Sequence, residues 1–236
     1  ILNMQIPFDK ATLNQVQREA VAKNKLKSAY LRPMCFYGSE GMGIRADSLK
    51  VHVMVAAWEW GKYLGEDGIE KGIRIRTSSY IRNHVNSVMC KAKANGNYMN
   101  SILALQEAIS CGYDEAMLLD HEGYVAEGSG ENIFLVRNGK LITPDLTSAL
   151  EGITRETIFQ LAEECNLEVV EKRITRDEVY VADEAFARTQ ARGVWNGTTT
   201  EPGRYRKFRK RQPAPEGCAI KGNISKTGER IYHTPG

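Results

Sequence analysis

Short strand-like and helix-like segments alternate along residues 8–186 without a regular strand–helix–strand repeat. Residues 51–58 (VHVMVAAW) are mainly apolar, and residues 73–79 (IRIRTSS) alternate as a half-buried strand does. Residues 8–23 and 97–111 have the character of helices. Because the regular crossover helices of an all-parallel sheet are missing, this order favours an α+β fold with a mixed sheet.

Turn and capping signals divide the second half of this region. Asn138-Gly139 predicts a two-residue hairpin turn, and Thr175 with Glu178 forms the capping-box pattern that begins a helix. Residues 187–195 can prolong a helix, after which the pattern degrades. Further strands are expected at 28–36, 116–120, 124–127, 133–137, 140–143 and 167–172, and a further helix at 154–165.

The charge changes sign after Phe186. Residues 187–236 hold 11 basic and three acidic side chains, a net charge of +8, whereas the preceding 186 residues hold 21 basic and 26 acidic ones, a net charge of −5. The run RYRKFRKR at 204–211 places two aromatic rings among six cations, which suits a nucleic acid or another polyanion. More often, however, a basic run of this kind is a solvated arm and not a binding site for a polyanion.

Several classes of protein are excluded. No apolar run reaches the roughly 18 to 20 residues of a membrane span, and the first residues lack the pattern of a signal peptide. The cysteines are odd in number and widely spaced, which argues against a disulfide framework and a zinc site and fits a reducing cytoplasm. They are Cys35, Cys90, Cys111, Cys165 and Cys218. We therefore expect a cytoplasmic protein without a metal site.

Lys93 and Tyr98 lie five residues apart in CKAKANGNYMNS. A lysine that forms a Schiff base needs a rigid element and an environment that favours its neutral amine, and a neighbouring phenol can hydrogen-bond a ring oxygen. Taken alone, a lysine is more often a solvent-exposed side chain and a tyrosine a half-buried core residue.

Glu127 in GYVAEGSGENIF and the segment LEGITRET supply two further features. A carboxylate that faces a pyridine nitrogen keeps that nitrogen protonated. A glycine before a predicted helix lets the N–H groups of Ile153 and Thr154, with the Thr154 hydroxyl, bind a phosphate. Each feature also has an ordinary explanation. Glu127 can be an acidic residue in a turn beside glycines, and the glycine before the predicted helix can be a simple helix cap. Together with Lys93 and Tyr98 they predict pyridoxal 5′-phosphate as cofactor.

In their amino-acid sequence and their order along the chain, the motifs of residues 26–186 resemble those of the branched-chain amino acid aminotransferases. These are class IV (fold type IV) pyridoxal phosphate enzymes. The matching strings are SAYLRP (28–33), GMG (41–43), WGKYLG (60–65), AKANGNYMNS (92–101), GYVAEGSGENIF (123–134), ALEGITRET (149–157) and DEVYVADEAF (177–186). The resemblance implies a D-amino acid aminotransferase-like large domain at residues 66–186, preceded by the C-terminal part of a small α/β domain at residues 1–65. We expect residues 187–236 to form a poorly ordered basic tail of different origin.

The resemblance also assigns roles to individual residues. Lys93 would bind the cofactor covalently and carry the proton of the substrate's α-carbon, Tyr98 would meet the ring oxygen, and Glu127 the pyridine nitrogen. Ile153 and Thr154 would bind the phosphate. On the substrate side, Tyr30 and Arg32 would orient carboxylates and Trp60 would line the pocket for a branched side chain, although core packing is a close alternative for Trp60. Glu131 and Asn132 would steady the turn after Glu127.

The implied reaction transfers the amino group of leucine, isoleucine or valine to 2-oxoglutarate, giving branched 2-oxo acids and glutamate, and the family's usual state is a homodimer. The chain begins at what resembles the last helix of the small domain, and the family's Gly-Thr-Ala-type turn does not follow residue 186. Residues 185–236 instead resemble the end of thermonuclease-like proteins. We therefore expect a chimeric chain with impaired activity; the alternative is an inactive scaffold with a polyanion-binding tail.

Overall fold

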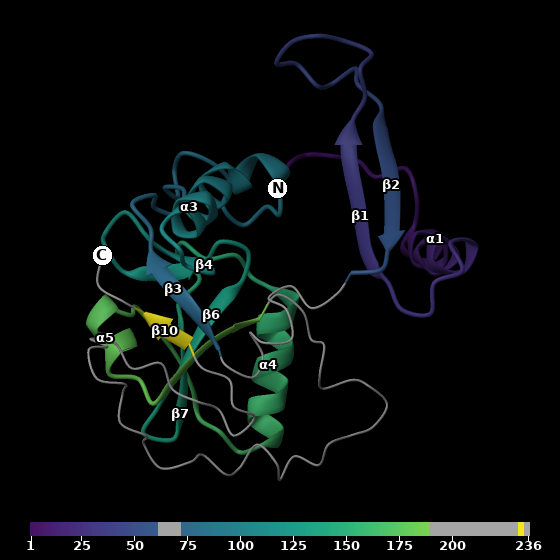
Figure 1. The fold of residues 1–236 in the computed structure, drawn as a ribbon. Coiled ribbons are helices and arrows are strands. Elements are labelled where there is room, and N and C mark those ends of the chain that lie inside the picture. The colour runs from purple at the N-terminus through teal and green to yellow at the C-terminus, as the bar shows by residue number, and fades with distance from the viewer. Residues whose placement is uncertain (61–71, 189–230, 234–236) are drawn as a thin grey trace. The chain divides into compact units, whose positions relative to one another are not determined.

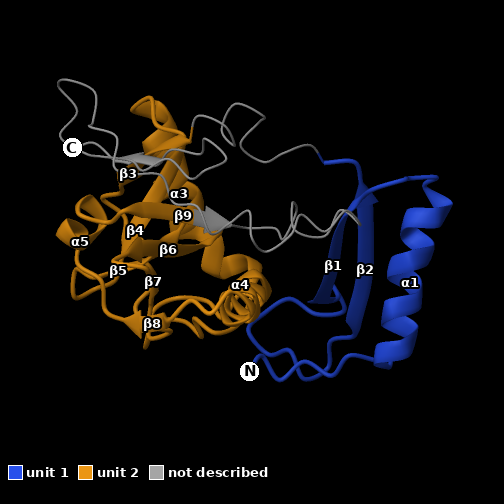
Figure 2. Ribbon diagram, turned by 90° about the horizontal axis from the view of Figure 1, so that it is seen from below, with its two compact units in different colours: residues 1–63 blue, residues 64–236 orange. Residues whose placement is uncertain are grey.

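The computed structural model describes residues 1–60, 72–188 and 231–233 (Figure 1). The chain divides into two compact units, residues 1–63 and 64–236 (Figure 2). The expected domain boundary after residue 65 lies outside the described residues, and the three-part division of the chain stays a prediction.

The described part of unit 1, residues 1–60, contains one helix and one antiparallel hairpin. Helix α1 (Lys10–Lys23) begins after Asp9, whose Oδ1 accepts a hydrogen bond from the Thr12 N–H at 2.7 Å, as an N-cap residue does. Strands β1 (Tyr30–Tyr37) and β2 (Val51–Trp58) pair antiparallel, with Tyr30 opposite Trp58. Helix α1 packs against β2. All three elements lie where the sequence predicts them.

Unit 2 is built on two four-stranded sheets (Figure 1). The first consists, in order, of β10 (Ile231–His233), β3 (Ile73–Thr77), β4 (Glu115–Leu119) and β5 (Val125–Gly128). The second consists of β8 (Val169–Lys172), β7 (Lys140–Pro144), β6 (Asn132–Arg137) and β9 (Glu184–Arg188). Both sheets combine parallel and antiparallel pairs, which confirms the expected mixed α+β architecture.

The helices of unit 2 cover these sheets through small and aromatic side chains. The 3₁₀ helix η1 (Asn95–Tyr98) leads directly into α3 (Met99–Ser110), which buries Ala104 and Ala108 against Ala116 and Leu118 of β4. Helix α4 (Ile153–Glu164) packs its apolar face on Phe134, Val136 and Leu141. The short helix α5 (Arg176–Tyr180) begins at the predicted capping box of Thr175 and Glu178.

The core lies between the two sheets. Apolar side chains of β3, β4, β5 and β6 form one buried cluster with Ile174, which is fully buried before α5. The hairpin from β6 to β7 turns at Asn138-Gly139, where φ is +52° and +74°. Positive φ at both central residues is what the primed two-residue turn requires, so the predicted hairpin is confirmed.

One expectation is wrong, and two strands, β9 and β10, were not predicted. Residues 187 and 188, expected to prolong a helix, belong to β9, which pairs antiparallel with β6. Within that pairing Phe186 stacks on Phe134 with ring centroids 5.2 Å apart, and sheet pairing and this burial override the helical pattern of the sequence. Strand β10, near the C-terminus, pairs parallel with β3. Within the described ranges, no helix is both long and apolar enough to span a membrane.

Candidate active site

Lys93 and Tyr98 are in contact. Lys93 Nζ donates a hydrogen bond to Tyr98 Oη at 2.9 Å. The loop that carries Lys93 is held by the buried Asn97, whose Nδ2 donates to the carbonyl oxygens of Met89 at 3.0 Å and Ala92 at 2.9 Å. The amine and the phenol are thus presented together just before α3.

Glu127 lies near the end of β5 and is buried. It forms an ion pair with Arg82, and its Oε2 accepts hydrogen bonds from the Leu150 N–H at 3.0 Å and from Asn132 Nδ2 at 3.3 Å. Burial raises the pKa of Glu127, while the positive charge of Arg82, the Leu150 amide and Lys93 oppose that rise. The positive charge of Lys93 is thus among the charges that act on the Glu127 carboxylate.

Arg82 connects the two halves of this arrangement. It is 3% exposed and faces the Glu127 carboxylate, and its Nη1 lies 3.4 Å from the carbonyl oxygen of Asn97. The same carbonyl accepts a hydrogen bond from Asn83 Nδ2 at 2.9 Å. Sequence analysis missed Arg82, because a single arginine in a loop carries no pattern that distinguishes it from an exposed one.

A second missed residue is Lys91, whose Nζ donates to the carbonyl oxygen of Ala149 at 3.1 Å. This carbonyl and the N–H of Leu150 that binds Glu127 belong to one peptide group, so Lys91 and Glu127 hold the two ends of that peptide. Burial lowers the pKa of Lys91, and the negative charge of Glu151 opposes that shift most strongly.

The first turn of α4 completes the site. Gly152 is its N-cap, Ile153 is 89% exposed, and Thr154 follows in the same turn. A Cβ at Gly152 would overlap Asn132 Oδ1, so any larger residue there would force the Asn132 side chain to move. Asn132 Nδ2 also donates to the Leu150 carbonyl oxygen at 2.9 Å, which ties the approach to the helix to Glu127.

The predicted substrate residues of unit 1 form a cluster of their own. The rings of Tyr30 and Trp60 meet edge to face with centroids 4.4 Å apart, and Trp58 stacks on Trp60 at 5.5 Å. Arg32 Nη2 donates to Tyr30 Oη at 2.9 Å. The guanidinium and the tyrosine hydroxyl are therefore held beside an aromatic surface.

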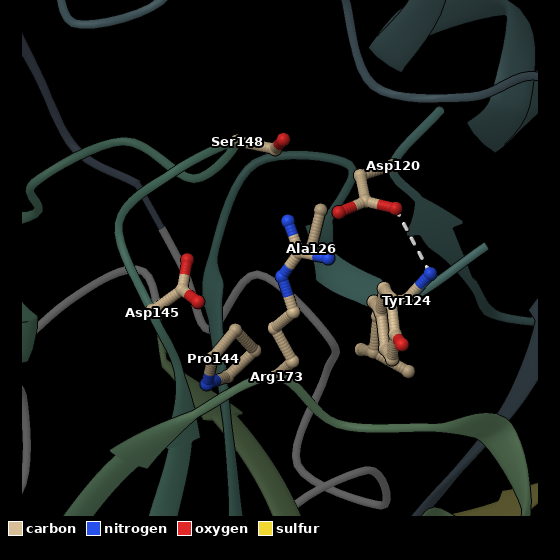
Figure 3. Close-up of a pocket in the computed structure, with 8 residues that line it drawn as sticks. Asp120, Tyr124, Ala126, Pro144, Asp145, Ser148 and Arg173 are labelled. Atoms are coloured by element: carbon tan, nitrogen blue, oxygen red, sulfur yellow. Dashed lines mark hydrogen bonds between the residues drawn. The ribbon is translucent and has the colours of Figure 1, made fainter. Parts of the chain in front are cut away.

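A small pocket of unit 2 has a different character (Figure 3). Arg173 extends into it between Asp120 and Asp145, with Tyr124 beside it. Its lining includes none of the predicted site residues, and Arg173 is already paired with Glu122. Among the described residues no three His, Cys, Asp or Glu side chains are grouped as metal ligands. The basic run 204–211 lies outside the described residues.

Comparison with known proteins identifies the family of the chain. The family model described as amino-transferase class IV matches residues 1–198. The chain is 63% identical over 186 residues to the branched-chain-amino-acid aminotransferase of Pseudomonas aeruginosa, covering 79% of this chain and 61% of the relative. It is 45% identical over 176 residues to the enzyme of the same name from Escherichia coli K12, covering 74% and 57%. The chain thus spans about three-fifths of the length of these relatives.

Solved structures give the same result. The branched-chain amino acid aminotransferase of Escherichia coli superimposes with a TM-score of 0.77 at 42% identity, covering 78% of this chain and 62% of that one. The enzyme of the same name from T.th., solved with pyridoxamine 5′-phosphate, gives 0.75 at 47% identity, covering 79% and 62%. The expected fold type IV is confirmed, and the chain belongs to the class IV aminotransferase family.

Proposed function

We propose that the protein is a pyridoxal phosphate-dependent aminotransferase that moves the amino group of leucine, isoleucine or valine to 2-oxoglutarate. The products are the branched 2-oxo acid and glutamate. The observation that carries this proposal is the contact of Lys93 with Tyr98 beside the buried Glu127, in a chain so similar to branched-chain aminotransferases.

The donor set fits pyridoxal phosphate group by group. Lys93 offers an amine for the aldehyde, Tyr98 a hydroxyl for the ring oxygen, and Glu127 a buried carboxylate for the ring nitrogen. The first turn of α4 at Ile153 and Thr154 offers backbone N–H groups for the phosphate. When bound, the cofactor supplies an electron-poor ring that stabilises negative charge on the substrate's α-carbon.

The protein side of the reaction is proton handling and positioning. Lys93 Nζ would accept the proton that the substrate's α-carbon loses and carry it to its new position, and Tyr98 Oη would steady the amine through their 2.9 Å hydrogen bond. Arg82 and the Leu150 amide favour the ionised form of Glu127, and this carboxylate would keep the ring nitrogen of a bound cofactor protonated.

In this proposal, the residues that select the substrate belong to unit 1. Arg32 and Tyr30 orient the carboxylate, because a guanidinium matches carboxylate geometry. Trp60, packed edge to face on Tyr30, supplies apolar surface for a branched aliphatic side chain.

The test is glutamate formation from leucine and 2-oxoglutarate by the purified chain with pyridoxal phosphate. Lys93→Ala removes the amine and is expected to abolish turnover. The matched control is Lys140→Ala, which removes an exposed lysine paired with Glu168 on the β7–β8 surface and is expected to leave turnover intact. The proposal fails if the wild-type chain forms no glutamate, or if Lys93→Ala retains the activity.

We also propose that the protein is a homodimer that uses the outer face of α3. Met99, Ile102 and Ile109 are each more than half exposed, and their spacing puts them on one helix face. Ile102→Glu with Ile109→Glu is expected to halve the mass measured by sedimentation. A monomeric wild-type chain would contradict this proposal.

Two other expectations stay predictions. Binding of nucleic acid through residues 204–211 is tested by a mobility shift that weakens with salt and is lost when these residues are deleted. A cytoplasmic location is tested by cell fractionation.

A further inference from the structure

Three buried carboxyl groups lie around the turn that follows Glu127. Glu115, Glu127 and Glu131 are 1%, 5% and 6% exposed, and the buried Arg82 is paired with Glu127. If all three were ionised, Glu115 and Glu131 would be buried carboxylates without an ion-pair partner among the described residues, beside the ion pair of Glu127 with Arg82. Unpaired buried charges are strongly unfavourable, and such groups take up protons instead.

Glu115 and Glu131 hold the turn from both sides. The Ser129 N–H lies 3.4 Å from Glu115 Oε1, and the next amide, Gly130 N–H, donates to Glu131 Oε2 at 3.1 Å. The turn is closed by the Gly128 N–H, which donates to the Glu131 carbonyl oxygen at 2.8 Å. The carboxyl groups of Glu115 and Glu131 are therefore bound to consecutive amides of one turn, and the proximity of Glu115 is one cause that raises the pKa of Glu131.

A hydrogen bond between two carboxyl groups needs a proton on one of them. Glu115 Oε2 is buried, and no N–H or O–H of the described residues donates to it. Its other oxygen, Oε1, accepts hydrogen bonds from the Ala116 N–H at 2.6 Å and the Ser129 N–H at 3.4 Å. Among the described N–H groups, only that of Gly130 donates a hydrogen bond to the Glu131 carboxyl group.

We propose that Glu131 holds a proton at neutral pH and donates it to Oε2 of Glu115, so that the pair is a buried proton site that fixes the turn at residues 128–131. Burial and the negative charges of Glu115 and Glu127 raise the pKa of Glu131 well above its ordinary value. The proton provides the missing donor for Glu115 and removes one of the three buried negative charges.

Glu131 and Glu115 are then positioning residues. The turn that they hold begins after Glu127 and ends at Asn132, and these two side chains are hydrogen-bonded to each other. Loss of the proton would set two buried carboxylates against each other at this turn. The inference concerns the protein without cofactor and does not rest on the proposed function.

The proton makes stability depend on pH in a defined direction. Because the pKa of Glu131 is higher in the folded than in the unfolded chain, its contribution is complete below the unfolded pKa. It is lost as the pH rises through the folded pKa. In the window between the two values, the unfolding equilibrium constant of wild type rises about tenfold per pH unit relative to a variant that lacks this group.

Urea unfolding of the whole chain from pH 4 to 9 tests the site with Glu131→Gln, whose amide resembles the protonated acid and can donate to Glu115. The control is Glu164→Gln, which changes an exposed carboxylate on α4. We expect the unfolding constant of Glu131→Gln to lose the tenfold-per-unit rise, and that of Glu164→Gln to keep it. Parallel curves for wild type and Glu131→Gln, or a Glu131→Gln chain that does not fold, would overturn the proposal.

Infrared difference spectra at pH 7 provide a second readout. Wild type minus Glu131→Gln is expected to show the carbonyl stretch of one protonated carboxyl group, shifted in deuterium oxide. Wild type minus Glu164→Gln is expected to show only the bands of an ionised carboxylate. A carboxylate signal in the first difference would show that Glu131 is ionised and would refute the proton site.

Discussion

Arg82→Met should destabilise the protein through Glu127. The substitution keeps the approximate length of the buried arginine stem but removes the only positive charge that is ion-paired with Glu127 among the described residues. Removing one partner of a buried ion pair typically costs about 3–5 kcal/mol, because the other charge is left uncompensated. The contact of Arg82 Nη1 with the Asn97 carbonyl, at 3.4 Å, is lost as well.

Proton uptake by Glu127 sets an upper limit to the electrostatic part of this loss. Protonating a glutamate that is ionised in the unfolded chain costs about 3.7 kcal/mol at pH 7 and about 1 kcal/mol at pH 5. We therefore expect Arg82→Met to lower the free energy of unfolding by roughly 3–4 kcal/mol at pH 7 and by clearly less at pH 5.

The assay is urea unfolding at both pH values, with the double variant Arg82→Met/Glu127→Gln. The double variant should recover most of the loss, because the glutamine oxygen can still accept from the Leu150 N–H without a buried charge. Lys140→Met is the control, since it breaks an exposed pair with Glu168 and should change stability by less than about 1 kcal/mol. An equal loss at pH 5 and pH 7, or no recovery in the double variant, would refute the reasoning.

Three other substitutions test the supporting structure by urea unfolding. Gly152→Ala should lower the free energy of unfolding by roughly 1–3 kcal/mol, because its Cβ would overlap Asn132 Oδ1; adding Asn132→Ala should relieve the clash, and a loss that persists would contradict it. Phe134→Ala should cost about 3–5 kcal/mol, since the fully buried ring stacks on Phe186, and a loss below about 1 kcal/mol would be inconsistent with that packing. Thr175→Ala should cost about 1 kcal/mol by removing the capping box of α5, and no change would mean that the cap is dispensable.

Local patterns predicted most of the fold. The apolar run at 51–58 coincides with β2, and the Asn138-Gly139 turn lies where the sequence places it. The errors concern elements that depend on distant partners. Strand β9 forms because residues 184–188 meet β6, and β10 forms on β3, more than 150 residues earlier in the chain.

In the candidate site, too, local motifs identified some residues, and residues that act through distant contacts were missed. Lys93 and Tyr98 are close in sequence and meet in the structure, so local motifs were enough to select them. Arg82 and Lys91 act on Glu127 across tertiary contacts, one by an ion pair and the other through the peptide between residues 149 and 150. A single sequence contains no periodicity or spacing that reports such contacts.

Covalent binding of pyridoxal phosphate by Lys93 can be measured on the protein itself. The purified chain is incubated with the cofactor, reduced with borohydride, digested and analysed by mass spectrometry. We expect one dominant modified peptide, with the pyridoxyl phosphate mass on Lys93, and no such peptide from Lys93→Ala. Modification that falls mainly on Lys91, or that is spread over exposed lysines such as Lys140, would contradict it.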